Sequence, residues 1–146
     1  MTIIEIDNRT IALINELLEV WEDSVKATHW FLSNEEINKI KEYGFKRGIS
    51  IKPNTDINKL IPYLNDIDLI LIMTVEPGQG GQPFLENSPT RIKEIKNLIK
   101  DKNILLEVDG GINDKTIKLL KDVDIAVVGS YITTSDNMIE KVKTLV

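Results

Sequence analysis

Leu69-Ile70-Leu71-Ile72-Met73 is the longest uninterrupted apolar run in the chain, and it is the strongest single indication of the fold class. A strand with one face in water alternates apolar and polar residues, whereas this run is apolar at every position. Such continuity is typical of a strand buried on both faces, as in a parallel sheet covered by helices. The run is far too short to span a bilayer as a helix. It therefore predicts an interior strand of an α/β protein.

The segments on either side of this run alternate between strand-like and helix-like patterns. Together with residues 69–75, the strand-like segments are residues 48–51, 104–109 and 125–130, with weaker candidates at 2–6 and 25–29. Helical spacing or a helix-start signal marks residues 8–23, a helix opened by Ser33, and residues 56–64, 89–100, 114–121 and 136–145. Strict alternation of strands and helices implies a parallel α/β sheet, either open and doubly wound or closed as a barrel. Periodicity does not choose between these two.

The composition is that of an ordinary folded domain. With 146 residues, 42% of them hydrophobic and 28% charged, the chain fits one domain over residues 1–146. A net charge of −5 argues against nucleic acid or an anionic membrane surface as the main partner. The absence of cysteine excludes disulfides and thiolate metal sites. Residues 1–10 have no apolar core followed by a cleavage site, so we expect no signal peptide and a cytoplasmic protein.

Glycine and polar residues gather where three of the predicted strands end. The sequence Glu-Pro-Gly-Gln-Gly-Gly-Gln occupies residues 76–82, Asp-Gly-Gly residues 109–111 and Gly-Ser residues 129–130. Ligands of both α/β architectures bind at the carboxyl ends of strands, and glycine lets backbone amides approach an anion closely. Any one of these segments taken alone is better explained as a tight turn. Three of them in register on successive strands favour a shared anionic ligand.

Three single residues could serve either chemistry or structure. Asp109 ends an apolar strand, and general acid/base work explains it no better than a plain helix N-cap. His29 is the only histidine, so it cannot build a metal site by itself, and a structural role is favoured. Met73, judged without any family comparison, is better explained by core packing.

Taken together, these segments resemble the motifs of a known family. Residues 73–84, Met-Thr-Val-Glu-Pro-Gly-Gln-Gly-Gly-Gln-Pro-Phe, resemble the sixth-strand signature of ribulose-phosphate 3-epimerases. Residues 107–113 and 127–130 are similar to the seventh and eighth strands of that family, residues 46–55 to the fifth, and residues 25–30 to the fourth. The motifs occur in the family's order, and the resemblance covers roughly residues 25 to 146.

The resemblance implies a partial (β/α)8 TIM barrel of the ribulose-phosphate-binding type, with strands three or four to eight. It implies an isomerase of the pentose phosphate pathway that interconverts ribulose 5-phosphate and xylulose 5-phosphate. Asp109 would be an acid/base and a ligand of a divalent metal (zinc, manganese or iron), and Met73 would cap the enediolate. The residues implied to hold the phosphate are Gly80, Gly81, Gln82, Gly110, Gly111, Gly129 and Ser130.

The departures from the family pattern concern the chemical step. The family's remaining metal ligands, two histidines and an aspartate that is also the second acid/base, belong to the second and third strands. If residues 2–6 are the third strand, residues 2–5, Thr-Ile-Ile-Glu, stand where the family carries His-Leu-Met-Val. Lys52 replaces the asparagine of the fifth-strand Asn-Pro, and Gln79 replaces an aromatic residue. One acid/base cannot serve both faces of C3, and one carboxylate is a poor metal site. We therefore expect phosphate binding without turnover in the isolated chain.

Length leads to an expectation about partners. A full barrel takes about 200–250 residues, and a chain of 146 residues fits about six βα units at most. An unclosed sheet has two free edges, which proteins usually cover or pair, so we expect a homo-oligomer or a partner chain besides a phosphorylated sugar. Two alternatives stay open. One is a non-catalytic remnant or regulatory protein that binds a phosphate ligand, and the other is a related hexulose-6-phosphate epimerase.

Overall fold

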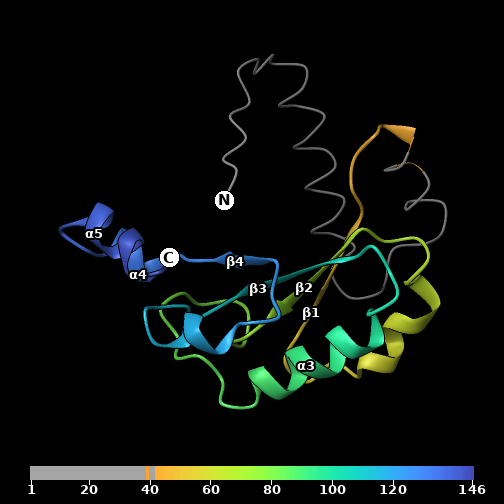
Figure 1. Cartoon of the computed structure of the whole chain (residues 1–146), viewed down its shortest axis with the longest axis horizontal. Helices are drawn as coiled ribbons and strands as arrows, with labels where there is room; N and C mark the ends of the chain where they lie inside the picture. Colours follow the sequence, from red (N-terminus) through yellow and green to blue (C-terminus); the bar gives the residue numbers. More distant parts are fainter. Residues whose placement is uncertain (1–38, 40–41) are drawn as a thin grey trace. The chain divides into compact units, whose positions relative to one another are not determined.

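The computed structural model of the chain describes Lys39 and residues 42–146 (Figure 1). The elements expected at residues 2–6, 8–23 and 25–29, and the start of the helix at Ser33, lie outside the described residues. The chain divides into two compact units, Met1–Lys39 and Ile40–Val146, and the described sheet belongs to the second. In the part of the chain that is described, no helix has the length and apolar character needed to cross a membrane.

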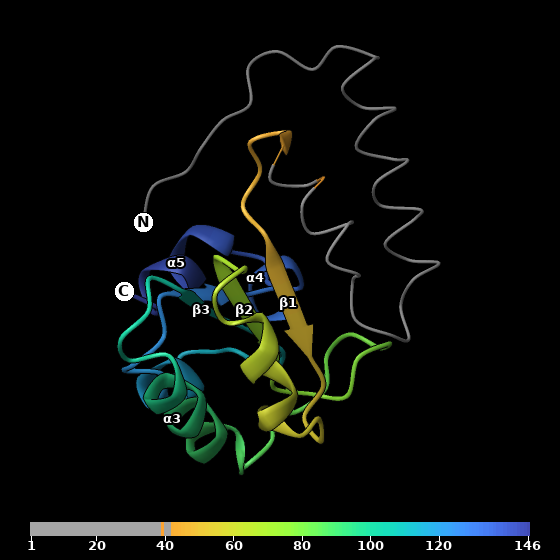
Figure 2. The ribbon, with the colours of Figure 1, turned by 90° about the vertical axis from the view of Figure 1, so that its right-hand side faces the viewer.

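Four parallel strands form the centre of this unit, in the order in which they occur in the sequence. They are β1 (Gly48–Ile51), β2 (Leu69–Met73), β3 (Leu105–Asp109) and β4 (Ile125–Val127). Met73 pairs with Asp109, and Asp109 pairs with Val127, so the last three strands end level with one another. The parallel α/β sheet predicted from the sequence is therefore confirmed, and Figure 2 shows its first three strands side by side.

The helical segments are shorter than predicted in most cases. They are η1 (Ile57–Tyr63), α3 (Ser88–Leu98), η2 (Thr116–Leu119), α4 (Ser130–Thr133) and α5 (Met138–Lys143). Asp56 caps η1, which is a 3₁₀-helix, and Pro62 inside it has no N–H to donate. The helix predicted at residues 114–121 is only a four-residue 3₁₀ turn, introduced by the Asn113 side chain.

Two predicted strands are too long. The segment predicted at residues 69–75 ends as a strand at Met73, since the Thr74 hydroxyl and the chain after it turn toward the loop that follows β3. The segment predicted at residues 125–130 ends at Val127, and Ser130 already begins α4. In both cases the strand ends earlier than predicted, so the loop that follows it begins nearer the sheet.

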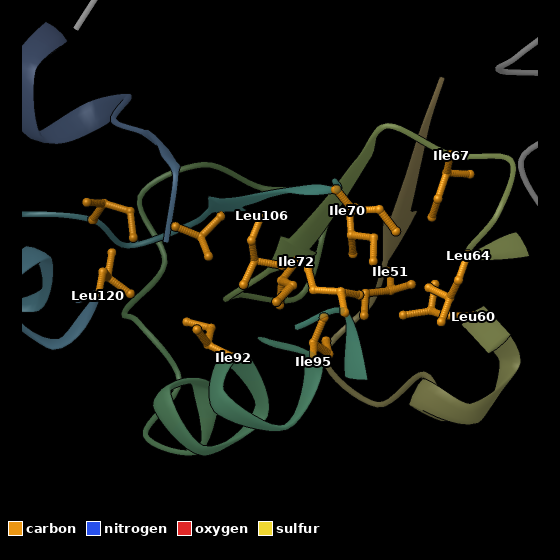
Figure 3. Packing of buried hydrophobic residues seen from close by; sticks show 14 residues of the cluster. Ile51, Leu60, Leu64, Ile67, Ile70, Ile72, Ile92, Ile95, Leu106 and Leu120 are labelled. Carbon is orange, nitrogen blue, oxygen red and sulfur yellow. The ribbon is translucent and has the colours of Figure 1, made fainter. Parts of the chain in front are cut away.

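One face of the sheet is packed against η1 and α3, which lie together on that side in Figure 1. The four side chains that β2 and β3 turn to this face are completely buried: Ile70, Ile72, Leu106 and Val108. Ile92 and Ile95 of α3 and Leu60 of η1 pack against them (Figure 3). Complete burial of each such side chain contributes about 1.5–3 kcal/mol, so this layer stabilises the unit.

The opposite face of the sheet is less buried. Alternation along the strands turns Leu69, Leu71 and Met73 to this side, and all three are only half-buried. On β4, Ile125 and Val127 are 38% and 39% exposed. The prediction that residues 69–73 are buried on both faces is therefore met on the helix-covered face alone, because no described helix packs on the other.

Candidate functional site

A hollow of about 320 Å³ lies where β2, β3 and β4 end. Its walls come from the ends of these three strands and from the loops that follow them. All nine residues predicted to form the site line it: Met73, Gly80, Gly81, Gln82, Asp109, Gly110, Gly111, Gly129 and Ser130. Level strand ends bring together segments that are more than fifty residues apart in the sequence.

The loop after β2 is held in shape by the side chain of Gln82. Its Nε2 donates to the carbonyl oxygens of Glu76 at 2.6 Å and Gln79 at 2.7 Å. A side-chain amide has two hydrogens to donate, so both are engaged within the loop. Any donor that Gln82 offers to a phosphate is then its backbone N–H, and its side chain closes the loop.

The turn after β3 requires glycine at two positions. Gly110 and Gly111 have φ of 121° and 65°, values that L side chains rarely adopt. A Cβ on Gly110 would lie 2.5 Å from Cγ2 of Val75, and one on Gly111 would overlap the backbone nitrogen of Phe84. The loops after β2 and β3 are thus packed directly on each other.

The backbone amides of these loops are available to a ligand. Within residues 42–146, the backbone N–H groups of Gly81, Gly111 and Gly129 donate to no protein acceptor. Successive N–H groups in a turn form a concave site of partial positive charge that suits an anion. The lining contains neither lysine nor arginine, so an anion in this hollow would meet neutral donors only.

The loop after β1 is connected to the same rim. Nδ2 of Asn54 donates to Oε1 of Glu76 at 3.3 Å, which joins the loops after β1 and β2. Nη2 of Arg91, on α3, donates to the carbonyl oxygens of Lys52 and Thr55. Lys52, which departs from the family pattern, is exposed and does not line the hollow.

Two carboxylates lie on β3, on the open face of the sheet. Glu107 and Asp109 are two residues apart, so strand alternation turns them to the same side, and both are half-buried. Burial raises the pKa of Glu107 above its ordinary value, and the negative charge of Asp109 raises it further. No group of three or more histidine, cysteine, aspartate or glutamate side chains forms a metal cluster among the described residues. His29 lies outside them.

Thr74 is a residue of this region that the sequence does not single out. It is completely buried, and its Oγ1 lies 2.9 Å from the carbonyl oxygen of Asp109 and 2.6 Å from that of Gly110. The available signal was a hydroxyl residue between Met73 and Val75, at the end of an apolar strand. The sequence prediction placed it inside the strand over residues 69–75 and gave it no separate role.

The fold and the rim define a class of protein: an α/β chain with the arrangement of a partial TIM barrel, whose glycine-rich loops meet at the carboxyl ends of its strands. The chain belongs to the ribulose-phosphate 3 epimerase family, whose sequence profile matches residues 14–133. The resemblance found in its motifs is thereby confirmed.

Curated relatives agree with this assignment. The chain is 39% identical over 101 residues to the ribulose-phosphate 3-epimerase of Bacillus subtilis, which covers 66% of this chain and 46% of that protein. It is 45% identical over 105 residues to that of Buchnera aphidicola subsp. Baizongia pistaciae, covering 69% and 46%. For the Helicobacter pylori enzyme, identity is 44% over 100 residues, covering 66% and 46%. The chain spans about half the length of the curated relatives it matches.

Proposed function

We propose that this chain binds the phosphate group of a pentulose 5-phosphate in the hollow at the ends of β2, β3 and β4. In a completed barrel it would supply the phosphate site and one acid/base of a ribulose-phosphate 3-epimerase in the pentose phosphate pathway of the cytoplasm. The observation that carries the proposal is that all nine predicted residues line one hollow with unengaged glycine amides among them.

The phosphate contacts would come from the backbone. The N–H groups of Gly81, Gly111 and Gly129 and the hydroxyl of Ser130 are neutral donors that suit the phosphate oxygens. Because no lysine or arginine lines the hollow, the phosphate would be held by short-range hydrogen bonds and not by a long-range charge. Saturating ligand should stabilise the fold by about 1–3 kcal/mol.

Asp109 would take part in moving the C3 proton. Its carboxylate accepts the proton as the C3–H bond breaks, and the electron pair enters an enediolate that spans C2 and C3. Return of a proton to the other face of C3 completes the inversion. Met73, which also lines the hollow, would pack against the planar intermediate. Asp109 stands on one side only, so the opposite-face acid must come from outside the described residues.

The divalent metal implied by the family resemblance is not accommodated by the described residues. Asp109 and the neighbouring Glu107 are two carboxylates, and no third histidine, cysteine or acidic side chain joins them in residues 42–146. A zinc, manganese or iron site would need further ligands from elsewhere.

We further propose that other strands complete the sheet, either from a second copy or from a partner chain. β1 and β4 are edge strands of the described sheet, and Ile125 and Val127 of β4 are partly exposed on its open face. Pairing would cover these edges and bury this apolar surface. The same assembly would bring the missing acid/base to C3.

A non-catalytic phosphate-binding protein is the second candidate. The observation that favours it is the absence of a three-ligand metal cluster from the described part of the chain. Such a protein would bind phosphate in the same hollow and would not transfer the C3 proton.

The test has two arms, run on the wild type and on Asp109→Asn. Thermal shift with ribulose 5-phosphate should stabilise both proteins, and unphosphorylated ribulose should stabilise neither. A coupled assay for xylulose 5-phosphate, with zinc or manganese present, should detect no turnover in either isolated protein. Turnover by the wild type that Asp109→Asn abolishes would show a complete enzyme. Absence of stabilisation by any phosphate compound would overturn the proposed phosphate site.

A further inference from the structure

The buried core of the described unit contains few polar groups, and Thr74 is the most deeply placed of them. Thr74 and Ser88 are the polar residues among its buried side chains, at 0% and 3% exposure. Burying a hydroxyl without a partner is costly. The position of Thr74 is therefore understandable only through the two carbonyl oxygens that its Oγ1 contacts, those of Asp109 and Gly110.

The two carbonyls differ in what else they accept. The Asp109 oxygen already accepts the backbone N–H of Thr74 at 2.8 Å, which extends the strand ladder by one bond. A hydroxyl has one proton to donate. The Gly110 oxygen is the nearer acceptor, at 2.6 Å against 2.9 Å for the Asp109 oxygen. The Thr74 hydroxyl therefore donates its proton to the Gly110 oxygen.

That bond fixes the orientation of one peptide group. The peptide unit is planar and trans, so the N–H of Gly111 points opposite to the Gly110 carbonyl. Met73 and Val75 line the hollow and Thr74 does not. The carbonyl held by Thr74 is thus turned away from the hollow, and the N–H of Gly111 is turned toward it.

We infer that Thr74 is a positioning residue, whose hydroxyl holds the peptide between Gly110 and Gly111 so that the Gly111 N–H faces the ligand. The inference rests on the proposed function, since the phosphate is that ligand. Glycine has no side chain to prevent peptide rotation, so a Gly-Gly turn needs an external bond to keep one orientation. Thr74 supplies it from inside the core, on the side where a ligand cannot compete.

The experiment compares Thr74→Val, which keeps the shape of the side chain and removes the hydroxyl, with Thr74→Ser, which keeps the hydroxyl. Titration calorimetry with inorganic phosphate and with ribulose 5-phosphate should show about tenfold weaker binding for Thr74→Val. Thr74→Ser should bind within about threefold of the wild type. Ser88→Ala is the matched control, because it removes a buried hydroxyl from α3, outside the hollow, and should leave affinity unchanged.

A second readout does not depend on any ligand. Backbone amide order parameters of Gly110 and Gly111, measured by NMR, should fall from rigid values near 0.85 toward about 0.6 in Thr74→Val and stay rigid in Thr74→Ser. If Thr74→Val fails to fold, Thr74→Ser and Thr74→Ala differ by one oxygen and give the same comparison. Wild-type affinity and rigid amides in the variant without a hydroxyl would overturn the inference. If the wild type binds no phosphate while the amides still loosen, the proposed function fails and the positioning role stands.

Discussion

Along β2 the side chains on the two faces of the sheet are equally apolar, but they differ in how deeply they are buried. On the face that η1 and α3 cover, Ile70 and Ile72 are completely buried. On the other face, Leu69 and Leu71 are half-buried, although they are equally apolar. The first face is therefore a core covered by helices, whereas the second face leaves apolar side chains partly exposed. The hollow and the carboxylates of β3 belong to the second face.

Two neighbouring leucines on β3 test the contrast between the two faces, and here the largest effect is expected. Leu106 points into the covered face and is completely buried, whereas Leu105 points to the open face and is half-buried. We expect Leu106→Ala to lower the free energy of unfolding by about 3 kcal/mol through lost burial and a cavity. Leu105→Ala should cost about 1 kcal/mol, since less area leaves water there. Urea denaturation measures both, and equal losses would mean that the open face is also a core.

A second test concerns the rim of the open face. In Gly111→Ala the new methyl group meets the backbone of Phe84 and a positive φ, so we expect a loss of about 2 kcal/mol or more. Gly80→Ala is the matched control, because a Cβ there has open space and the residue has no positive φ. Its effect should stay within about 0.5 kcal/mol. Thermal unfolding that does not separate the two variants would show that the rim is less constrained than its glycines indicate.

The third test concerns what covers the open face. Val127→Glu places a charge on that face, at an edge strand, and should weaken self-association about tenfold, or about 1.4 kcal/mol. Ile61→Glu is the control, because Ile61 is also partly exposed, at 52%, but lies on η1 in the helix layer. Sedimentation at high micromolar concentration distinguishes them. A wild type that stays monomeric there would count against self-association and leave a partner chain to cover the face.

The smallest expected effect is a pH dependence that arises from Glu107. Because burial and Asp109 raise its folded-state pKa above the ordinary 4.5, the folded protein binds this proton more tightly than the unfolded chain. The stability it contributes is complete below the unfolded pKa and is lost as pH rises through the folded pKa. Glu107→Gln should therefore be more stable than the wild type at pH 7 and equal to it at pH 4. Denaturation midpoints at the two pH values measure this, and a difference that is the same at both would contradict the assignment.

The sequence predicted the fold and the candidate site from different kinds of pattern. The apolar run at residues 69–73 and the alternation around it were enough to predict the parallel sheet, because both report local periodicity. The glycine segments at residues 76–82 and 109–111 were enough to predict a shared hollow, because parallel strands place their carboxyl ends on one rim. Their roles toward a ligand stay predictions.

The order and direction of the strands, the family of the chain and the residues that meet at the rim could be inferred from the sequence alone. The folded structure was needed to show that one face of the sheet is open, that the Gln82 side-chain amide donates within its own loop, and that the Thr74 hydroxyl bonds to the turn after Asp109. Periodicity and glycine spacing are properties of neighbouring residues, so a sequence displays them. A hydrogen bond between residues 36 positions apart exists only once the strands have paired.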